Sequence, residues 1–299
     1  MSRVMPMLDN HDALVLRSVL FAPATRADVL AKLPRSQPDA AIIDLEDGVP
    51  FEAKEAARGV ARAAIENLTV SHPQVRWFMR LNAIDTPWFA DDVAQALIPT
   101  LTGVVLPKYE SLEQFEQLRS LLIRQHMEHL IVMVGIETAR GVEQVRQSLH
   151  APIGVAYFGA EDFIADMGGQ RTEEGLEVLY ARSRVVLAAR IAGIPALDQV
   201  VTDFYNNQRF STEAEQARAL GYTGKLCIHP AQVPLAKQHF SPSPHEIDHA
   251  QRLLDAYQRA QAVHQGVIVF EGQMVDLPMV RRAQTILAQR TTLAGKDDV

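Results

Sequence analysis

The stretch Gly154-Val-Ala-Tyr-Phe-Gly-Ala-Glu161-Asp162 decides the fold. Its mostly apolar residues ahead of Gly159 are typical of a strand that is covered on both faces in a parallel sheet. Two carboxylates follow, and buried carboxylates are costly unless a cation or hydrogen bonds meet them. The same order recurs upstream, with 131–136 before Glu137 and 40–43 before Asp44, Glu46 and Asp47. Three such strands predict an acidic pocket at one end of a sheet.

Strand and helix signals alternate along the chain to about residue 240. Apolar runs predict eight strands, at 14–21, 40–45, 75–81, 103–107, 130–136, 154–158, 196–201 and 225–228. Helical patterns follow them at 27–33, 52–67, 86–97, 112–126, 141–149, 176–192 and 211–220. Eight strand-and-helix units predict an α/β fold, a (β/α)8 TIM barrel over residues 1–240. The alternative is an open doubly wound sheet, but no glycine-rich nucleotide motif follows the first strand.

A second segment, 241–299, follows the predicted barrel. Ser241-Pro-Ser-Pro244 marks the junction. Helices are expected at 245–265 and 278–289, on either side of a hairpin whose turn is Glu271-Gly272-Gln273. About sixty residues are too few for a robust independent core. We therefore expect this segment to pack on the barrel or on a neighbouring subunit.

Composition and charge narrow the class of protein. The chain has 299 residues, of which 47% are apolar and 22% charged, as in ordinary globular proteins. Its net charge of −7 argues against nucleic acid as a partner, since that requires a basic face. The lone Cys227 excludes an intramolecular disulfide and a cysteine-based metal site. The first sixteen residues contain no long apolar run, so we expect no membrane anchor and a cytoplasmic location.

Residues at the predicted strand ends are the candidates for chemistry, because parallel barrels place functional groups there. They are Arg26, Asp44, Glu46, Asp47, Arg80, Asn82, Lys108, Glu137, Arg140, Glu161, Asp162, Lys225 and His229. Carboxylates without paired histidines suit Mg²⁺, or Mn²⁺, rather than zinc. Glu137 and Asp162, on adjacent predicted strands, are the natural metal-binding pair. Two plainer readings stay open: a single acid here can simply cap the next helix, and Lys108 can be a solvated loop residue.

Seven short motifs, taken together and in order, resemble the citrate lyase β-subunit family of acyl-CoA lyases. This family includes malyl-CoA and citramalyl-CoA lyases and is related to the pyruvate aldolases. The similarity runs from about Arg17 to Gln289, nearly the whole chain. The motifs are Arg17-Ser-Val-Leu-Phe-Ala-Pro, Ile43-Asp-Leu-Glu-Asp-Gly-Val-Pro, Met79-Arg-Leu-Asn, Val105-Leu-Pro-Lys, Gly135-Ile-Glu-Thr-Ala-Arg-Gly, Phe158-Gly-Ala-Glu-Asp-Phe and Gly224-Lys-Leu-Cys-Ile-His-Pro.

The resemblance implies a set of site residues. Glu137 and Asp162 would bind Mg²⁺, and Glu46 and Asp47 would hold waters on the metal. Arg80 would face the thioester oxygen, and Arg80 and Glu137 together would contact the substrate. Arg26 and Lys32 would meet the phosphates or adenine of coenzyme A. Segment 241–299 would be a lid in a homo-oligomer, expected to be a trimer, and Asp276 of its Val275-Asp276-Leu277-Pro278 motif would be the acid or base.

The resemblance also implies a reaction, the cleavage of a β-hydroxyacyl-CoA thioester to acetyl-CoA and a 2-keto acid. Citramalyl-CoA or malyl-CoA is favoured over citryl-CoA. One departure concerns the substrate, because the loop Asp203-Phe-Tyr-Asn-Asn-Gln208 carries amides where more acidic residues are expected. Two alternatives stay open: a citrate lyase β-subunit that acts on a carrier-protein thioester within a complex, and a non-enzymatic barrel that only binds coenzyme A.

Overall fold

The computed structural model describes residues 14–262 and 266–297, with side chains described as far as residue 290. The chain divides into two compact units, one spanning Val15–Lys237 and the other beginning at Gln238. Part of the helix expected at 245–265 falls on residues 263–265, which lie outside the described residues.

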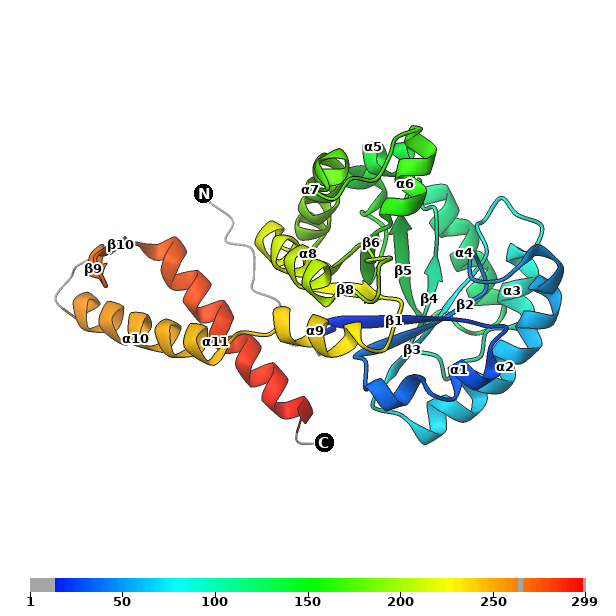
Figure 1. Ribbon diagram of the computed structural model, residues 1–299, viewed down its shortest axis with the longest axis horizontal. Helices are drawn as coiled ribbons and strands as arrows, with labels where there is room; N and C mark the ends of the chain where they lie inside the picture. Colours follow the sequence, from blue (N-terminus) through cyan, green and yellow to red (C-terminus); the bar gives the residue numbers. More distant parts are fainter. Residues whose placement is uncertain (1–13, 263–265, 298–299) are drawn as a thin grey trace. The chain divides into compact units, whose positions relative to one another are not determined.

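The first unit is a closed barrel of eight parallel strands with helices around it, as the sequence predicts (Figure 1). The strands follow one another around the barrel in chain order. They are β1 (Ser18–Pro23), β2 (Ala40–Asp44), β3 (Arg76–Arg80), β4 (Gly103–Leu106), β5 (Ile131–Ile136), β6 (Val155–Phe158), β7 (Ala196–Asp198) and β8 (Gly224–Cys227). Nearly every strand residue is buried, because side chains fill the lumen on one face and helices cover the other.

Two helices of this part of the chain were absent from the sequence prediction. The helices are α1 (Ala27–Leu30), α2 (Lys54–Ser71), α3 (Phe89–Gln95), α4 (Leu112–Arg124), α5 (Ala139–Ser148), α6 (Ala160–Met167), α7 (Leu176–Ala192), α8 (Asn207–Leu220) and α9 (Gln232–His239). The two additions are α6 and α9, each eight residues long. Helix α6 begins directly after β6, so Glu161 and Asp162 lie in its first turn rather than in a loop. Acidic side chains are favourable there because they face the positive end of the helix dipole.

Lys225 was expected at the end of a strand, and this was wrong. It is the second residue of β8 and is fully buried, with its Nζ 2.5 Å from Oδ2 of Asp198 on the neighbouring strand. Arg182 of α7 donates to both oxygens of the same carboxylate, at 3.0 and 3.1 Å. Buried charges persist only when paired in this way. Lys225 therefore belongs to the barrel wall and not to its mouth.

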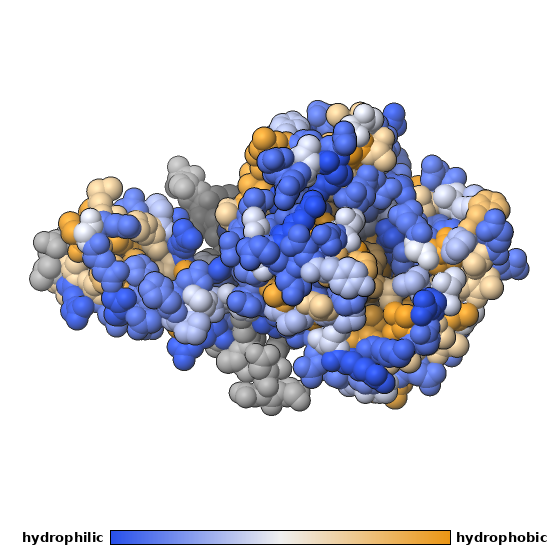
Figure 2. Space-filling model, in the orientation of Figure 1, coloured by the Kyte–Doolittle hydropathy of each residue, from blue (hydrophilic) through white to orange (hydrophobic). Residues whose placement is uncertain are grey.

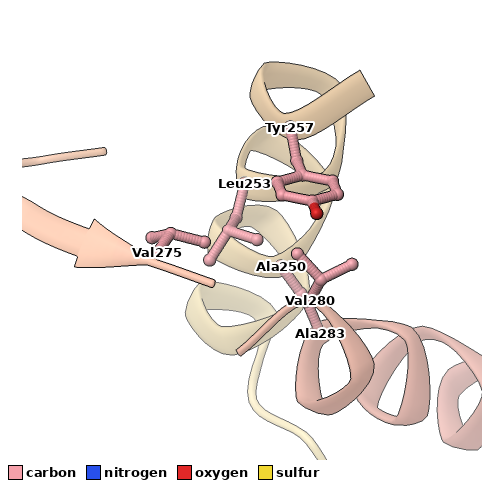
Figure 3. Packing of buried hydrophobic residues seen from close by; sticks show 6 residues of the cluster. All are labelled: Ala250, Leu253, Tyr257, Val275, Val280 and Ala283. Carbon is pink, nitrogen blue, oxygen red and sulfur yellow. The ribbon is translucent and has the colours of Figure 1, made fainter. Parts of the chain in front are cut away.

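The second unit contains two helices, α10 (Pro244–Gln261) and α11 (Leu277–Asp297), and a hairpin of β9 (Ile268–Phe270) and β10 (Gln273–Val275). Ser243 and Glu246 form a reciprocal capping box at the start of α10, with Pro244 as its first residue. Figure 3 shows the small core of this unit, with residues from α10, β10 and α11 in contact. These residues are Ala250, Leu253, Tyr257, Val275, Val280 and Ala283.

No helix among the described residues is both long and apolar enough to cross a membrane. The face of the molecule in Figure 2 is mostly hydrophilic, with scattered hydrophobic patches.

Candidate active site

The acids that were predicted to form a pocket cluster at the carboxyl ends of β2 to β6. Asp44 and Arg80 are the last residues of β2 and β3, and the strand register pairs them directly. Glu137 follows β5, and Asp162 lies just beyond β6 in the first turn of α6. Because parallel strands end on the same side of the barrel, residues far apart in sequence meet at its mouth.

Arg80 is held by a carboxylate that was not assigned a role from the sequence. Its Nε and Nη2 donate to the two oxygens of Asp44, each at 2.7 Å, and both side chains are buried. Asp44 also accepts from the backbone N–H groups of Glu46 and Gly48, at 2.8 and 2.9 Å. Burial opposes the charge of Asp44, but Arg80 and these hydrogen bonds outweigh it and hold the pKa of that carboxyl below its ordinary value. Asp44 thus fixes the position of the guanidinium.

Glu46 and Asp47 lie on the other side of the same guanidinium. Nη1 of Arg80 is 2.8 Å from Oε2 of Glu46 and 3.4 Å from Oδ2 of Asp47. Burial raises the pKa of Glu46 to about 8, against the lowering effect of Arg80, and the charges of Glu137 and Asp47 add to the rise. The loop after β2 therefore brings two further carboxyl groups to the mouth of the barrel.

Glu137 is the most buried acid of the mouth, with 2% of its surface exposed. One of its oxygens accepts the backbone N–H of Lys108 at 2.9 Å, and the structure gives it no salt bridge among the described residues. Burial raises the pKa of its carboxyl in spite of the charge of Arg80, and Asp162 adds to the rise. The hydroxyl of Tyr157, buried on the neighbouring strand β6, contributes a further polar group beside it.

Two glycines make room for this carboxylate. A Cβ on Gly159 would lie 2.6 Å from Cγ and 2.8 Å from Oε1 of Glu137. A Cβ on Gly135 would lie 2.4 Å from the Tyr157 hydroxyl and 2.9 Å from Cδ of Glu137. Real Cβ atoms do not approach this closely. Gly135 and Gly159, each two positions before an acidic residue in its motif, are therefore part of the site.

Gly159→Ala is expected to displace the Glu137 carboxylate and to lower the affinity for Mg²⁺ by at least about tenfold, the size of effect seen when residues that orient a metal ligand are changed. The measurement is a calorimetric titration with MgCl₂. Gly59→Ala is the matched control, because its Cβ would meet nothing within 4 Å on α2. It should leave binding unchanged and should stabilise the helix by about 0.5–1 kcal/mol. Equal Mg²⁺ affinity in both variants would contradict this role for Gly159.

The donor set of the mouth fits a hard divalent cation. Among the described residues, no three acidic, histidine or cysteine side chains are gathered closely enough to hold an ion by themselves. Mg²⁺ does not require this, since it usually takes one or two carboxylates and keeps several waters. Oε2 of Glu46 is buried, but the Arg80 guanidinium lies 2.8 Å from it, whereas Glu137 is buried without an ion-paired partner in the described part of the chain. A cation held by Glu137 and Asp162 would compensate the buried charge of Glu137.

The structure does not bring the two residues predicted to meet coenzyme A into this cluster. Arg26 and Lys32 lie after β1 and are more than half exposed, and both pair with Asp28. The hydrogen bond from Arg26 is the main cause that lowers the pKa of Asp28 to about 2. Asp276 belongs to the second unit, where it directly precedes α11 and its carbonyl accepts the N–H of Val280.

A cavity of about 180 Å³ opens beside Glu161, between the loops that follow β6 and β7 and the start of α8. Two arginines and two threonines line it together with three glutamates and two valines; the residues are Glu161, Arg171, Thr172, Glu173, Val200, Val201, Thr202, Arg209 and Glu213. It is therefore a polar cavity of mixed charge.

Comparison with known proteins agrees with this geometry. Residues 17–230 match the family described as HpcH/HpaI aldolase/citrate lyase. A citrate lyase subunit beta-like protein of Deinococcus radiodurans is 50% identical over 282 residues, which cover 93% of this chain and 99% of that protein. A mitochondrial citramalyl-CoA lyase of Homo sapiens is 29% identical over 307 residues, covering 96% of this chain and 89% of the human protein.

Solved structures of similar proteins contain ligands. The structure of CitE from Mycobacterium tuberculosis, in complex with magnesium, acetoacetate and coenzyme A, gives a TM-score of 0.76 at 33% identity, covering 91% of this chain and 97% of CitE. A citrate lyase beta subunit of the same organism, complexed with oxaloacetate and magnesium, gives a TM-score of 0.65 at 32% identity, with coverages of 76% and 98%. This chain belongs to the HpcH/HpaI aldolase/citrate lyase family. The resemblance predicted from the sequence motifs is confirmed.

Proposed function

We propose that this protein is a Mg²⁺-dependent carbon–carbon lyase that cleaves a β-hydroxyacyl-CoA thioester to acetyl-CoA and a 2-keto acid. Citramalyl-CoA or malyl-CoA is the favoured substrate, with citryl-CoA as a further candidate. One observation carries the proposal: Glu46 and Asp47 contact the fixed guanidinium of Arg80 at the barrel mouth, and the charges of Arg80 and Asp162 both act on the buried carboxyl of Glu137. Relatives named as lyases, and CitE structures holding magnesium, support it.

In this proposal Glu137 and Asp162 hold Mg²⁺, and Glu46 and Asp47 order water around it. When bound, the ion supplies positive charge for the carboxylate and hydroxyl of the substrate. By holding the ion, Glu137 also positions the substrate. We assign the binding of the polar groups of coenzyme A to Arg26 and Lys32. The loop after β6 would contribute through the cavity that Arg171 lines.

The reaction breaks the bond between the α and β carbons of the thioester. The hydroxyl passes its proton to a water ordered by Glu46 and Asp47 and becomes the keto group, while the electron pair of the broken bond passes to the acyl part as an enolate. Arg80 meets the developing negative charge on the thioester oxygen. Its hydrogen bonds to Asp44 hold the guanidinium in place before the charge develops. A proton delivered to the enolate carbon then gives acetyl-CoA, and we assign this step to Asp276.

Asp276→Asn is expected to lower turnover by about 10²–10⁴-fold, the usual contribution of a positioned general acid or base. Asparagine caps a helix as well as aspartate does, so α11 and the melting temperature should be preserved. Asp255→Asn, on α10 of the same unit, is the control and should retain full activity. The measurement is the steady-state cleavage rate together with a melting curve. Unimpaired turnover in Asp276→Asn would remove this residue from the mechanism.

Segment 241–299 is, in the same proposal, a lid for the barrel of its own chain or of a neighbouring subunit, within a homotrimer. Light scattering on the purified protein measures the mass of the assembly. Mixing Asp276→Asn with Arg80→Ala subunits tests whether the lid acts between chains. Activity recovered in the mixture, where neither variant is active alone, would support a lid that is shared between subunits.

A second candidate is a citrate lyase β-subunit that acts on a carrier-protein thioester. It is favoured by the citrate lyase subunit beta of Escherichia coli, which is 32% identical over 291 residues and covers 93% of this chain. A non-enzymatic barrel that only binds coenzyme A would not need Arg80, Glu137 and Asp162 together.

The deciding experiment offers citramalyl-CoA, malyl-CoA and citryl-CoA to the purified protein with Mg²⁺ and detects acetyl-CoA and the keto acid. Cleavage of one thioester, abolished by EDTA and restored by Mg²⁺, would support the lyase proposal and identify the substrate. No cleavage of any thioester, with Mg²⁺ and coenzyme A still bound, would favour the carrier-protein substrate. Failure to bind Mg²⁺ would contradict the proposal.

A further inference from the structure

Lys108 lies at the centre of the acidic mouth. Its Nζ is 2.7 Å from Oε1 of Glu46, 3.5 Å from Oδ1 of Asp47 and 3.5 Å from Oδ1 of Asp162. Its side chain is 31% exposed, so it reaches into the cluster from the loop after β4 rather than into open solvent. The ammonium therefore bridges one residue of the assigned metal pair and both of the water-ordering acids.

The backbone of Lys108 is held in an unusual conformation. Its φ angle is 48°, in the left-handed region that residues other than glycine adopt rarely. Its N–H donates to Oε2 of Glu137, and the next N–H, of Tyr109, donates to the carbonyl of Gly135 at 2.8 Å. Such conformations persist where surrounding contacts impose them, and they are frequent at functional sites. One residue thus contacts Glu137 through its backbone and Asp162 through its side chain.

The charges explain why an ammonium occupies this position. Asp44, Glu46, Asp47, Glu137 and Asp162 meet at the mouth, and Arg80 is already engaged by Asp44. The Lys108 ammonium neutralises part of this negative charge through its contacts with Glu46, Asp47 and Asp162.

We infer that the Lys108 ammonium is a built-in competitor of Mg²⁺ at Asp162, and that it makes Mg²⁺ binding depend on an anionic substrate. A divalent ion bound by Asp162 would lie close to this ammonium, and like charges at such distances repel strongly inside a protein. Lys108 must then withdraw from Asp162 as the ion enters. A substrate carboxylate in the mouth compensates both cations, so ion and substrate strengthen each other's binding. This inference rests on the magnesium site of the proposed function and concerns its regulation.

The test is a calorimetric titration of the full-length protein with MgCl₂, alone and with sodium pyruvate as the anionic probe. Lys108→Met is expected to bind Mg²⁺ about tenfold tighter than the unmodified protein in the absence of pyruvate, within the 5–150-fold range of typical coupling effects. Pyruvate should tighten Mg²⁺ binding in the unmodified protein and should do so less in Lys108→Met. Lys108→Arg, which keeps the charge, should stay within about threefold of the unmodified protein, a difference below that range.

Lys237→Met is the matched control, because this lysine lies 4.0 Å from Asp39, which precedes β2, whereas the acids of the mouth follow the strands. It should leave the Mg²⁺ affinity unchanged, which separates a local effect from a change in net charge. Lys108→Asn is the second variant if the methionine variant does not fold, since asparagine tolerates the left-handed backbone. It should tighten Mg²⁺ binding in the same direction.

The sign of the change distinguishes the possible roles of Lys108. A purely structural lysine would leave Mg²⁺ binding weaker or unchanged when it is replaced, and either result would overturn the inference. Equal pyruvate coupling in the unmodified protein and in Lys108→Met would also overturn it. If the unmodified protein binds no Mg²⁺ even with pyruvate present, the metal site of the proposed function fails, and this inference fails with it.

Discussion

Arg80→Ala is expected to lower turnover by about 10²–10³-fold, because it removes a fixed positive charge from the position where the enolate oxygen forms. The structure adds a second effect that the sequence alone did not indicate. The change leaves Asp44 buried without its bidentate partner, and breaking a buried ion pair in this way costs about 3–5 kcal/mol. The variant should therefore be both much less active and less stable.

A second variant separates these two effects. The double change Arg80→Met with Asp44→Asn removes both members of the buried ion pair, and Glu46 keeps its contact with Lys108, so most of the lost stability should return while activity stays low. The measurements are urea unfolding for stability and the steady-state cleavage rate for activity. Recovery of turnover in the double variant would show that the arginine is structural and not catalytic.

Asp162→Asn and Glu137→Gln are each expected to weaken Mg²⁺ binding by about 100-fold or more, since changes even beyond the direct ligands of a metal cost 10–100-fold. Both replacements keep size and an acceptor oxygen. In Glu137→Gln that oxygen can still accept the backbone N–H of Lys108. The measurement is a titration with MgCl₂ followed by isothermal calorimetry, with cleavage rates recorded over the same range of Mg²⁺.

Glu161→Gln is the matched control for these two variants. Glu161 lies in the same helical turn as Asp162, but its side chain is paired with Arg171 at 3.1 Å and lines the neighbouring cavity. Its replacement removes one negative charge next to the site without removing an assigned ligand, so Mg²⁺ affinity should change by less than about threefold, far below the effect of losing a ligand. A loss as large as that of Asp162→Asn would mean that bulk charge, rather than coordination, governs Mg²⁺ binding.

The barrel could be predicted from the sequence because each strand is a short apolar run with glycine, proline or a charged residue near its end. Strands of this kind are buried on both faces, so their pattern does not depend on details of packing. Helix α6 was not predicted from the sequence because it is short and begins immediately after β6, where its two acids also fit the end of a strand. Helix α9 is short too and is followed by the proline-rich junction.

The acids of the site could be located from the sequence, but their partners could not. Asp44 and Arg80 both end strands, yet only the register of β2 and β3 shows that they pair. A lysine side chain is long and flexible, so no pattern indicates whether Lys108 points to solvent or into the cluster. Lys225 was predicted as a site residue but is buried in the barrel wall, because it pairs with Asp198 from another strand. Pairings between distant residues are tertiary information that local sequence does not carry.

The separate core of the second unit has a consequence for how the family diversifies. Six side chains from α10, β10 and α11 hold this unit together (Figure 3). Residues on its outer surface, such as Val269 and Met274, are largely exposed and take no part in that core. Such positions can change without loss of folding, whereas the strand ends of the barrel are tied to one another by buried ion pairs. New recognition properties should therefore arise faster by drift in this unit than in the barrel, which would keep the reaction constant while the range of accepted molecules changes.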